Sequence, residues 1–377
     1  MLRIFMTGDN HIGLKYTSHE KSAELAAARL NAFPGMVDRA NGENCGLFVI
    51  TGDLFENTYS IPKRDVSAVA DMLSAFKGTV AVLPGNHDYY DRDVKVWQYF
   101  KDAISKKDNI LLLSEYRPYT LDINGETVVL YPALCTSLHS APGENNLGWI
   151  KAEPMPQDGT YRLGVAHGAV EGETIDSEGA YFLMSRGELE SIPVDAWLIG
   201  HTHVPFPRDL AEDRFTRTGR IFNAGTHVQT DVSCNTEGCC FIIEIGPDKT
   251  VSAKKFRSGT VFFSRKHIAA GASGLAGALS AELSALPDNS SVDLILSGAV
   301  SAGEYASRRD IIENALSRFI EGTYDDTRLS KLITRRLIDA EFPETSFSAQ
   351  LLYSLLDEPK EAQLVYELLC GLKEGGK

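Results

Sequence analysis

The chain has 377 residues, and its hydrophobic content of 43% and charged content of 23% are ordinary for a folded globular protein. This length predicts more than one domain, because single hydrophobic cores rarely grow beyond about 250–300 residues. The formal net charge of −14 argues against a protein that coats nucleic acid with a broadly basic surface, but it leaves room for a local anion-binding groove.

The cysteines and the N-terminus indicate a reducing compartment. The six cysteines are sparse, and the vicinal pair Cys239-Cys240 lies in an apolar run without C-x-x-C spacing, which favours buried thiols. Met1 leads directly into the apolar segment 2–5, which leaves no room for a signal peptide, and no apolar run is long enough to span a membrane. We therefore expect a cytoplasmic protein without a membrane partner.

The first third of the chain alternates short β-branched runs with amphipathic segments. The pattern predicts strands at 2–7, 46–51, 80–83 and 109–113, and helices at 20–41, 63–76 and 93–104. Such alternation is typical of a mostly parallel sheet that is covered by helices.

After residue 113 the sequence pattern predicts mainly strands. A tight Asn124-Gly125 turn predicts a hairpin over 119–131. Further strands are expected at 162–166, 196–199, 220–223, 240–245 and 250–256. We therefore predict an α/β fold in which two sheets form a sandwich flanked by helices.

A third pattern begins near residue 259. Ala- and Leu-rich segments predict helices at 275–286, 306–319, 329–340, 349–356 and 361–372, around one strand at 292–296. His267 stands alone there, without other residues that could bind a metal. The sequence thus predicts two domains, 1–258 and 259–377, of which the second is an α+β cap or partner-binding lobe.

Metal-ligand chemistry follows five of the predicted strands. A single histidine at a strand end is more often a loop residue than a ligand, but five of the chain's nine histidines lie at such ends. Because ligands bind at the carboxyl ends of strands in α/β sheets, we expect these side chains to converge. The residues are Asp9, His11, Asp53, Asn86, His87, His167, His201 and His203.

These residue types indicate a metal site that acts on phosphorus. Oxygen and imidazole ligands without thiolate suit Mn²⁺, Fe or Zn²⁺ in open sites. Asp53 is the candidate bridge between two ions about 3.5–4 Å apart. Two divalent ions, less two aspartates and a bridging hydroxide, leave a net charge of about +1, which suits a phosphate ester whose negative charge grows in the transition state.

The motifs Asp-x-His, Gly-Asp, Gly-Asn-His-Asp, His-Gly and Gly-His-x-His occur in this order between Gly8 and His203. In this the chain resembles the calcineurin-like metallophosphoesterase superfamily. The resemblance implies that His87 protonates the leaving oxygen and that Asp88 orients its neighbours. It also implies one metal on Asp9, His11, Asp53 and His203, and a second on Asp53, Asn86, His167 and His201.

Within the superfamily, the chain is most similar to SbcD-type DNA repair exonuclease subunits, through the segments 52–55, 221–245 and 342–347. That resemblance implies a phosphodiesterase that cleaves the DNA backbone with a metal-bridging hydroxide. It also implies Mn²⁺ as the metal, with Fe or Zn²⁺ as alternatives, a homodimer, and an SbcC-like ATPase partner with a coiled coil. Two departures leave substrate and exonuclease strength open: Glu56 stands where such nucleases often have His, and Asn223–His227 replaces a Tyr-Pro-Gly run.

Two other functions stay open on the sequence. One is a metallophosphatase or phosphodiesterase that acts on nucleotides or other small phosphoesters. The other is a non-catalytic scaffold, which is disfavoured because every expected ligand is retained.

Four residues near the metal-site strands are candidate substrate contacts. Lys15, Tyr16 and Asn57 lie in loops after such strands and could line a nucleic-acid groove, although polar loop residues are common on any surface. His227 is a candidate for a substrate contact or for a purely structural loop residue.

Overall fold

The computed structural model describes residues 1–156, 159–174, 176, 178–234, 236–271 and 273–374. The chain forms two compact units, Met1–Phe262 and Phe263–Lys377. The boundary expected from the sequence, between residues 258 and 259, lies close to this division.

The first sheet of unit 1 contains the N-terminal strands. Its order is β4-β3-β2-β1-β11-β12-β9, in which β1 to β4 run parallel and β11 pairs antiparallel with β1. The strands are β1 (Leu2–Thr7), β2 (Leu47–Ile50), β3 (Thr79–Val82), β4 (Ile110–Leu112), β9 (Thr216–Arg217), β11 (Cys239–Ile245) and β12 (Val251–Arg257).

The second sheet of unit 1 has the order β10-β8-β7-β6-β5. The hairpin between β5 and β6 turns at Asn124 and Gly125, whose φ angles of 55° and 82° are those that this tight turn requires. The strands are β5 (Tyr119–Ile123), β6 (Glu126–Ala133), β7 (Tyr161–His167), β8 (Ala196–Gly200) and β10 (Ile221–Asn223).

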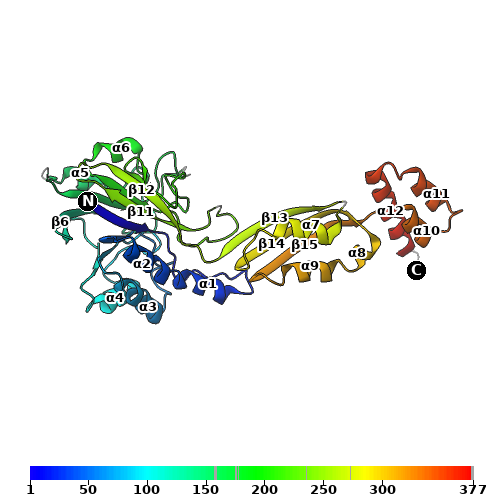
Figure 1. The fold of residues 1–377 in the computed structure, drawn as a ribbon, viewed down its shortest axis with the longest axis horizontal. Coiled ribbons are helices and arrows are strands. Elements are labelled where there is room, and N and C mark those ends of the chain that lie inside the picture. The colour runs from blue at the N-terminus through cyan, green and yellow to red at the C-terminus, as the bar shows by residue number, and fades with distance from the viewer. Residues whose placement is uncertain (157–158, 175, 177, 235, 272, 375–377) are drawn as a thin grey trace. The chain divides into compact units, whose positions relative to one another are not determined.

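Alternating side chains make each strand face two cores. In β1, Ile4 and Met6 belong to the same core as Val165 of β7 in the second sheet, whereas Phe5 belongs to the core that contains residues of α2, α3 and α4. Figure 1 shows α2, α3 and α4 on one side of unit 1 and α5 and α6 on the other. The predicted sandwich of two sheets flanked by helices is thus confirmed. The helices are α1 (Ser22–Asn31), α2 (Phe33–Gly42), α3 (Lys63–Ser74), α4 (Lys95–Ile104), α5 (Gly148–Ala152) and α6 (Arg186–Ser191).

The single helix predicted over 20–41 was wrong. The structure has α1 and α2 in this segment, separated at Ala32. Pro34 lies in the first turn of α2, where its missing N–H costs nothing, but it could not donate to a carbonyl inside a continuous helix.

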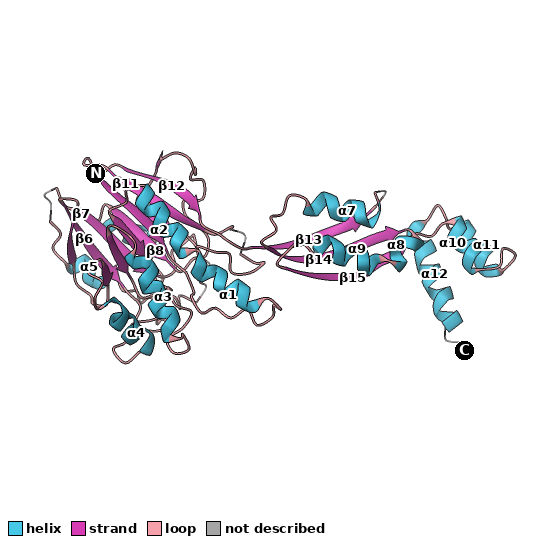
Figure 2. Cartoon of the chain, turned by 60° about the horizontal axis from the view of Figure 1, so that its bottom comes forward, coloured by secondary structure: helices cyan, strands magenta, loops and turns pink. Residues whose placement is uncertain are grey.

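Unit 2 contains a three-stranded sheet, β13-β14-β15, in which β14 and β15 run parallel. Figure 2 shows helices α7 and α9 along this sheet, and both contribute to its hydrophobic core. A second cluster joins α10, α11 and α12. The elements are β13 (Phe262–Ala270), α7 (Gly274–Leu283), β14 (Ser290–Val300), α8 (Ala302–Ala306), α9 (Arg308–Leu316), β15 (Glu321–Lys331), α10 (Arg335–Glu341), α11 (Phe347–Ser354) and α12 (Pro359–Glu374).

Two of these strands correct the sequence prediction of a single strand in this region. β15 carries mostly polar, exposed residues, so it lacks the apolar alternation by which a strand is recognised. The helix predicted over 329–340 was wrong at its start, because β15 continues to Lys331 and α10 begins only at Arg335.

None of the helices in the described ranges combines the length and the apolar character needed to cross a membrane. All six cysteines are free thiols, and five of them are buried. Cys239 and Cys240 face opposite sides of β11 and belong to different cores, which confirms the prediction of buried thiols.

Candidate metal centre

Five strand ends bring their polar residues to one place in unit 1. The residues follow the parallel strands β1, β2 and β3 of one sheet and β7 and β8 of the other. Four of them have left-handed backbone conformations, which cost about 1–3 kcal/mol each in side chains other than glycine and cluster at functional sites. Their φ angles are 49° at Asp9, 45° at His11, 50° at Asp53 and 100° at His201.

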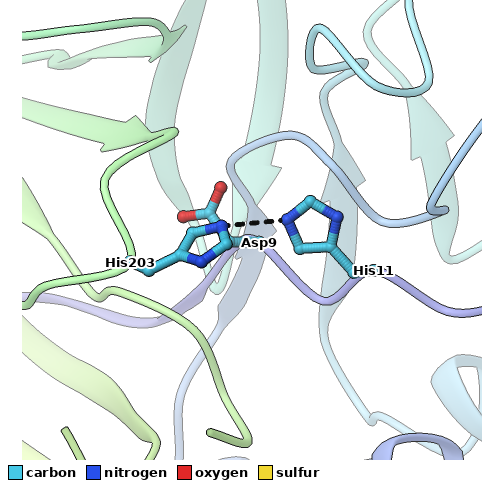
Figure 3. Close-up of side chains that lie close together, drawn as sticks. All are labelled: Asp9, His11 and His203. Atoms are coloured by element: carbon cyan, nitrogen blue, oxygen red, sulfur yellow. Dashed lines mark hydrogen bonds between the residues drawn. The ribbon is translucent and has the colours of Figure 1, made fainter. Parts of the chain in front are cut away.

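Asp9, His11 and His203 form the first group. Figure 3 shows the three side chains pointing toward one another, with the two imidazoles facing through their Nε2 atoms at 3.0 Å. The ligand atoms of the three residues all lie within 4.8 Å of one another. The three residues could hold one ion, whose ligands at about 2.0–2.2 Å would lie roughly 3–3.5 Å apart, as the two Nε2 atoms do.

Asp53, Asn86, His167 and His201 form the second group. His167 Nε2 lies 3.3 Å from Asp53 Oδ2 and 3.0 Å from Asn86 Oδ1, and His201 Nδ1 lies 3.1 Å from the same amide oxygen. His167 Nδ1–H donates to the Thr51 carbonyl at 2.8 Å, which turns Nε2 toward the carboxylate. The two groups adjoin, since the backbone N–H of His201 donates to Asp9 Oδ1 at 2.9 Å.

Burial and the neighbouring imidazoles set the pKa values of the two aspartates in opposite directions. Burial raises the pKa of Asp9 to about 6. Burial would also raise the pKa of Asp53, but His167 and the imidazoles of His11 and His87 outweigh it and hold that pKa well below its ordinary value. For His167, burial acts downward, yet Asp53 raises its pKa to about 9. The buried Asp53 carboxylate therefore keeps its negative charge beside His167, as a ligand of divalent cations requires.

Gly52 shows why small residues precede these ligands. Its φ is +104°, and a Cβ atom at this position would lie 2.1 Å from His167 Nδ1. Any larger residue would have to displace the imidazole, so the Gly52-Asp53 pair is required by close packing of the two sheets at the site.

His87 lies beside both groups. Its backbone N–H donates to Asp53 Oδ1 at 2.9 Å, and its Nδ1–H donates to the Glu56 carbonyl at 3.1 Å. With His11 and Asp53 it forms a third set of ligand atoms within 4.8 Å of one another. Its side chain is half-buried, whereas His167 is buried.

Asp88 is buried and braces two loops. Its carboxylate accepts the backbone N–H of Gly85 at 2.7 Å and that of Phe55 at 3.0 Å. Burial, and after it the charge of Asp53, raise the pKa of Asp88 to about 7. This residue therefore joins the segment after β3 to the segment after β2.

An open hollow of about 510 Å³ lies against the first group, with His11, His87 and His203 in its wall. Two predicted substrate contacts, Lys15 and Tyr16, also line it. Lys15 is exposed, and the Tyr16 hydroxyl lies 3.5 Å from the Arg29 guanidinium.

The other two predicted substrate contacts, His227 and Asn57, do not line this hollow. His227 is fully buried, with its Nε2–H donating to the Arg29 carbonyl at 2.8 Å and its ring centroid 5.6 Å from that of Phe33, so no substrate can reach it. The structure thus supports the structural alternative for this residue. The Asn57 side chain closes a turn, in which its Oδ1 accepts the backbone N–H of Ser60 at 2.7 Å, and Asn57 is not part of the hollow's wall.

Two residues near the centre, Arg29 and Tyr181, were not singled out from the sequence, and a third, Glu56, was noted only as a departure from the nuclease pattern. Arg29 is buried against the backbone of Asp9, Glu56 contacts the His11 ring, and the Tyr181 ring lies 5.0 Å from that of His201. The charged residue types of Arg29 and Glu56 within or beside apolar segments are a weak signal. Nothing in the sequence distinguishes Tyr181, which reaches the site through a long loop.

A sandwich with buried oxygen and imidazole ligands at its strand ends defines a class of divalent-metal hydrolases. The chain belongs to the calcineurin-like phosphoesterase family, which matches residues 2–205. Among solved structures, it is similar to TT1561 of Thermus thermophilus, at 12% identity and a TM-score of 0.39 over 67% of this chain and 97% of that one. It is also similar to the Pseudomonas putida nuclease MPE, at 17% identity and a TM-score of 0.22 over 48% of this chain and 73% of that one.

Proposed function

We propose that this phosphoesterase is a two-metal phosphodiesterase that cleaves the DNA backbone as an exonuclease. The observation that carries the proposal is the convergence of seven candidate ligand side chains from five strand ends, beside one histidine that borders an open hollow. The family supplies the reaction class, and the finer assignment to DNA is our own.

The residues present fit two divalent cations. One would be held by Asp9, His11, Asp53 and His203, and the other by Asp53, Asn86, His167 and His201. Bound there, the ions would act as Lewis acids on the phosphate and lower the pKa of water. The donors, hard oxygens and imidazoles without thiolate, suit Mn²⁺, Fe or Zn²⁺. Among these we propose Mn²⁺, on the resemblance to SbcD-type nucleases alone.

His87 is the proposed general acid. Its Nδ1–H is held by the Glu56 carbonyl, so when the ring carries a proton on both nitrogens its Nε2–H is the proton available to the leaving 3′-oxygen, and the ring is left neutral. The ring borders the hollow, where a substrate can meet it. Asn86 is neutral and therefore leaves the positive charge of the site intact for an anionic substrate.

A second hollow supports a polymeric substrate. It has a volume of about 710 Å³ and shares Val204 with the hollow beside the metal centre. Its wall contains Arg208, Lys255 and Arg257, of which Arg257 is bridged to Glu212 and Glu237. Basic side chains in a hollow that adjoins the one beside the metal centre favour a substrate with several phosphates. Such a substrate would bind along both hollows.

A nucleotide or another small phosphoester is the second candidate substrate. The hollow beside the metal centre has a volume of about 510 Å³, which falls within the range of about 300–1,000 Å³ that is usual for small-ligand pockets. A small substrate would need this hollow alone.

The test uses the purified full chain with Mn²⁺. End-labelled double-stranded DNA, mononucleotides and a chromogenic phosphodiester are incubated in parallel. We expect stepwise release of mononucleotides from DNA, and we expect His87→Gln to lower the rate by about 10²–10⁴-fold while two metal ions stay bound. Turnover of small esters with intact DNA would overturn the DNA assignment, and loss of a metal ion in His87→Gln would make His87 a ligand.

Charge reversal tests the polymer path. Arg208→Glu together with Lys255→Glu should weaken DNA binding and flatten its dependence on salt, because fewer phosphate contacts release fewer counterions, without changing turnover of the chromogenic diester. Arg64→Glu, at a side chain that is 86% exposed, serves as the control. Equal loss of both activities in the double variant would contradict the path.

The remaining partners are predictions from the resemblance alone. They are an SbcC-like ATPase with a coiled coil and a second copy of the chain, with unit 2 as the proposed cap or partner-binding lobe. Co-purification with such an ATPase, followed by deletion of unit 2, would test that role.

A further inference from the structure

Glu56 is held beside the metal centre by backbone pairing. Residues Ile12 and Phe55 form a parallel β-bridge, and the Glu56 N–H donates to the Ile12 carbonyl at 3.0 Å. One residue earlier, the His11 N–H donates to the Asp53 carbonyl at 2.9 Å. The segment after β1 and the segment after β2 are thus locked in register, which puts residue 56 next to residue 11.

The Glu56 carboxylate contacts the ring of a metal-ligand candidate. Its Oε2 lies 2.9 Å from His11 Nδ1, and the two side chains are 25% and 4% exposed. An ionised carboxylate can only accept a hydrogen bond, so His11 must carry its proton on Nδ1. The lone pair of His11 is then on Nε2, the atom that faces His203 Nε2 at 3.0 Å and Asp53 Oδ2 at 3.8 Å.

We propose that Glu56 is a positioning residue that fixes His11 in the Nδ1–H tautomer, so that Nε2 is the atom presented to a divalent cation. The charge of the carboxylate also makes the lone pair on Nε2 a stronger ligand for the cation. Partners of this kind usually change metal affinity by about 10–100-fold when they are removed. The inference rests on the metal centre of the proposed function and extends it to a residue outside the expected ligand set.

The two proposed metal sites differ in the group that orients their histidine ligand. The His167 ring is oriented by a neutral backbone carbonyl, that of Thr51, whereas the His11 ring is oriented by a carboxylate. Glu56 is also linked to His87, whose Nδ1–H donates to its backbone carbonyl. A substitution of the Glu56 side chain should therefore affect the site at His11 and spare the site at His167.

The experiment measures metal binding to the metal-free full chain, with Mn²⁺ in titration calorimetry and Co²⁺ as a spectroscopic probe. We expect Glu56→Ala to weaken one of two binding steps by about 10–100-fold and to alter the visible Co²⁺ spectrum of that site. Glu56→Gln should recover part of the loss, because its amide oxygen can still accept the His11 Nδ1–H. Glu56→Asp keeps the charge but is one methylene shorter, so it should bind like Glu56→Ala.

Glu188→Ala is the matched control. The Glu188 side chain is 18% exposed and bonds to Lys151, outside the three ligand groups. This variant should bind both ions as the unmodified chain does. Thermal unfolding of each metal-free variant shows whether it folds. If Glu56→Ala does not fold, Glu56→Gln still tests the proposal.

Unchanged affinity at both sites in Glu56→Ala would overturn the proposal. Equal weakening of both steps, or a Glu56→Gln variant as weak as a folded Glu56→Ala, would also contradict a specific role on His11. Because these readouts require no turnover, a chain that binds two ions but leaves DNA intact would refute only the proposed substrate.

Discussion

Arg29 connects the metal-site loop after β1 with the loop after β10. Its guanidinium is fully buried and donates to the backbone carbonyls of Asp9 at 3.1 Å, Asn10 at 2.9 Å and Val228 at 2.8 Å. A further bond reaches Thr226 Oγ1 at 3.0 Å. One side chain therefore satisfies several buried acceptors that helices and sheets leave unpaired, which is why so polar a group is tolerated inside.

We predict that Arg29→Met lowers the free energy of unfolding by about 1–3 kcal/mol, because the Asn10 carbonyl loses the donor Arg29 Nε–H, whereas the carbonyls of Asp9 and Val228 still lie within hydrogen-bond distance of Thr226 Oγ1. Urea unfolding of the metal-free protein, followed by fluorescence, measures the change. Arg64→Met, at an exposed site, should stay within about 0.5 kcal/mol of the unmodified chain. Similar values for the two variants would show that the buried network contributes little.

His227 is a second polar residue inside this region. Burial, and after it the Arg29 guanidinium, hold the pKa of His227 well below its ordinary value of 6.5. Its Nδ1 has no hydrogen-bond partner within the described part of the chain. The folded protein therefore keeps this imidazole neutral, whereas the unfolded chain can protonate it.

We predict that His227 makes the fold sensitive to acid. Because its folded pKa is depressed, its contribution to stability is complete above pH 6.5 and is lost as the pH falls toward the folded pKa, with a slope of up to about 1.4 kcal/mol per pH unit. Urea unfolding between pH 7 and 5 should show a shallower slope in His227→Gln. The exposed His139, replaced in His139→Gln, should leave the slope as it is. If the free energy of unfolding depends on pH with the same slope in all three proteins, His227 is not the source of the acid sensitivity.

At the scale of elements, the strand ends are the best-predicted part of the molecule. Short apolar runs that end at Gly-Asp, Gly-Asn-His-Asp or Gly-His-x-His indicated both the strands and the polar residues that converge at their ends, because burial on both faces leaves a continuous apolar signal. The helix break at Ala32 and the strand β15 were missed for opposite reasons. Amphipathic spacing continues through the break, and the exposed β15 has little apolar pattern to recognise.

Close packing at the strand ends gives a prediction for Gly52→Ala. The new Cβ would clash with His167 Nδ1 at 2.1 Å, and its φ of +104° is strained for alanine. We expect at least about a tenfold loss of Mn²⁺ affinity in calorimetry, because a ligand is displaced. Gly35→Ala is the control: this exposed glycine in α2 has open space around it, so the helix should gain about 0.5–1 kcal/mol of stability. Unchanged affinity in Gly52→Ala would show that the two loops can separate freely.

At the scale of the whole molecule, the two units have separate hydrophobic cores. The cores of unit 1 lie between and outside its two sheets, whereas those of unit 2 lie under α7 and α9 and among α10 to α12. All three metal-ligand groups found among the described residues belong to unit 1. Metal binding should therefore stabilise one unit and not the other.

We predict two melting transitions, of which only one responds to metal. With Mn²⁺ at about 100 times its dissociation constant, each occupied site should add about 2.7 kcal/mol to the stability of unit 1, and a chelator should reverse the gain. Scanning calorimetry with limited proteolysis assigns each transition to a unit. A shift of the unit 2 transition by the same amount would contradict the assignment of metal binding to unit 1 alone.

The sequence by itself determined the sandwich and the ligand types, because apolar strands and the polar residues that end them are local patterns of a few positions. It could not determine which polar residues meet, because contacts such as Glu56 with His11, Arg29 with Val228 and His227 with Phe33 join segments that are distant along the chain. Burial also depends on the whole fold, and it separated His87, at the edge of a hollow, from His227, inside the core. Both are loop histidines in the sequence, and only the packing around them decides which one a substrate can reach.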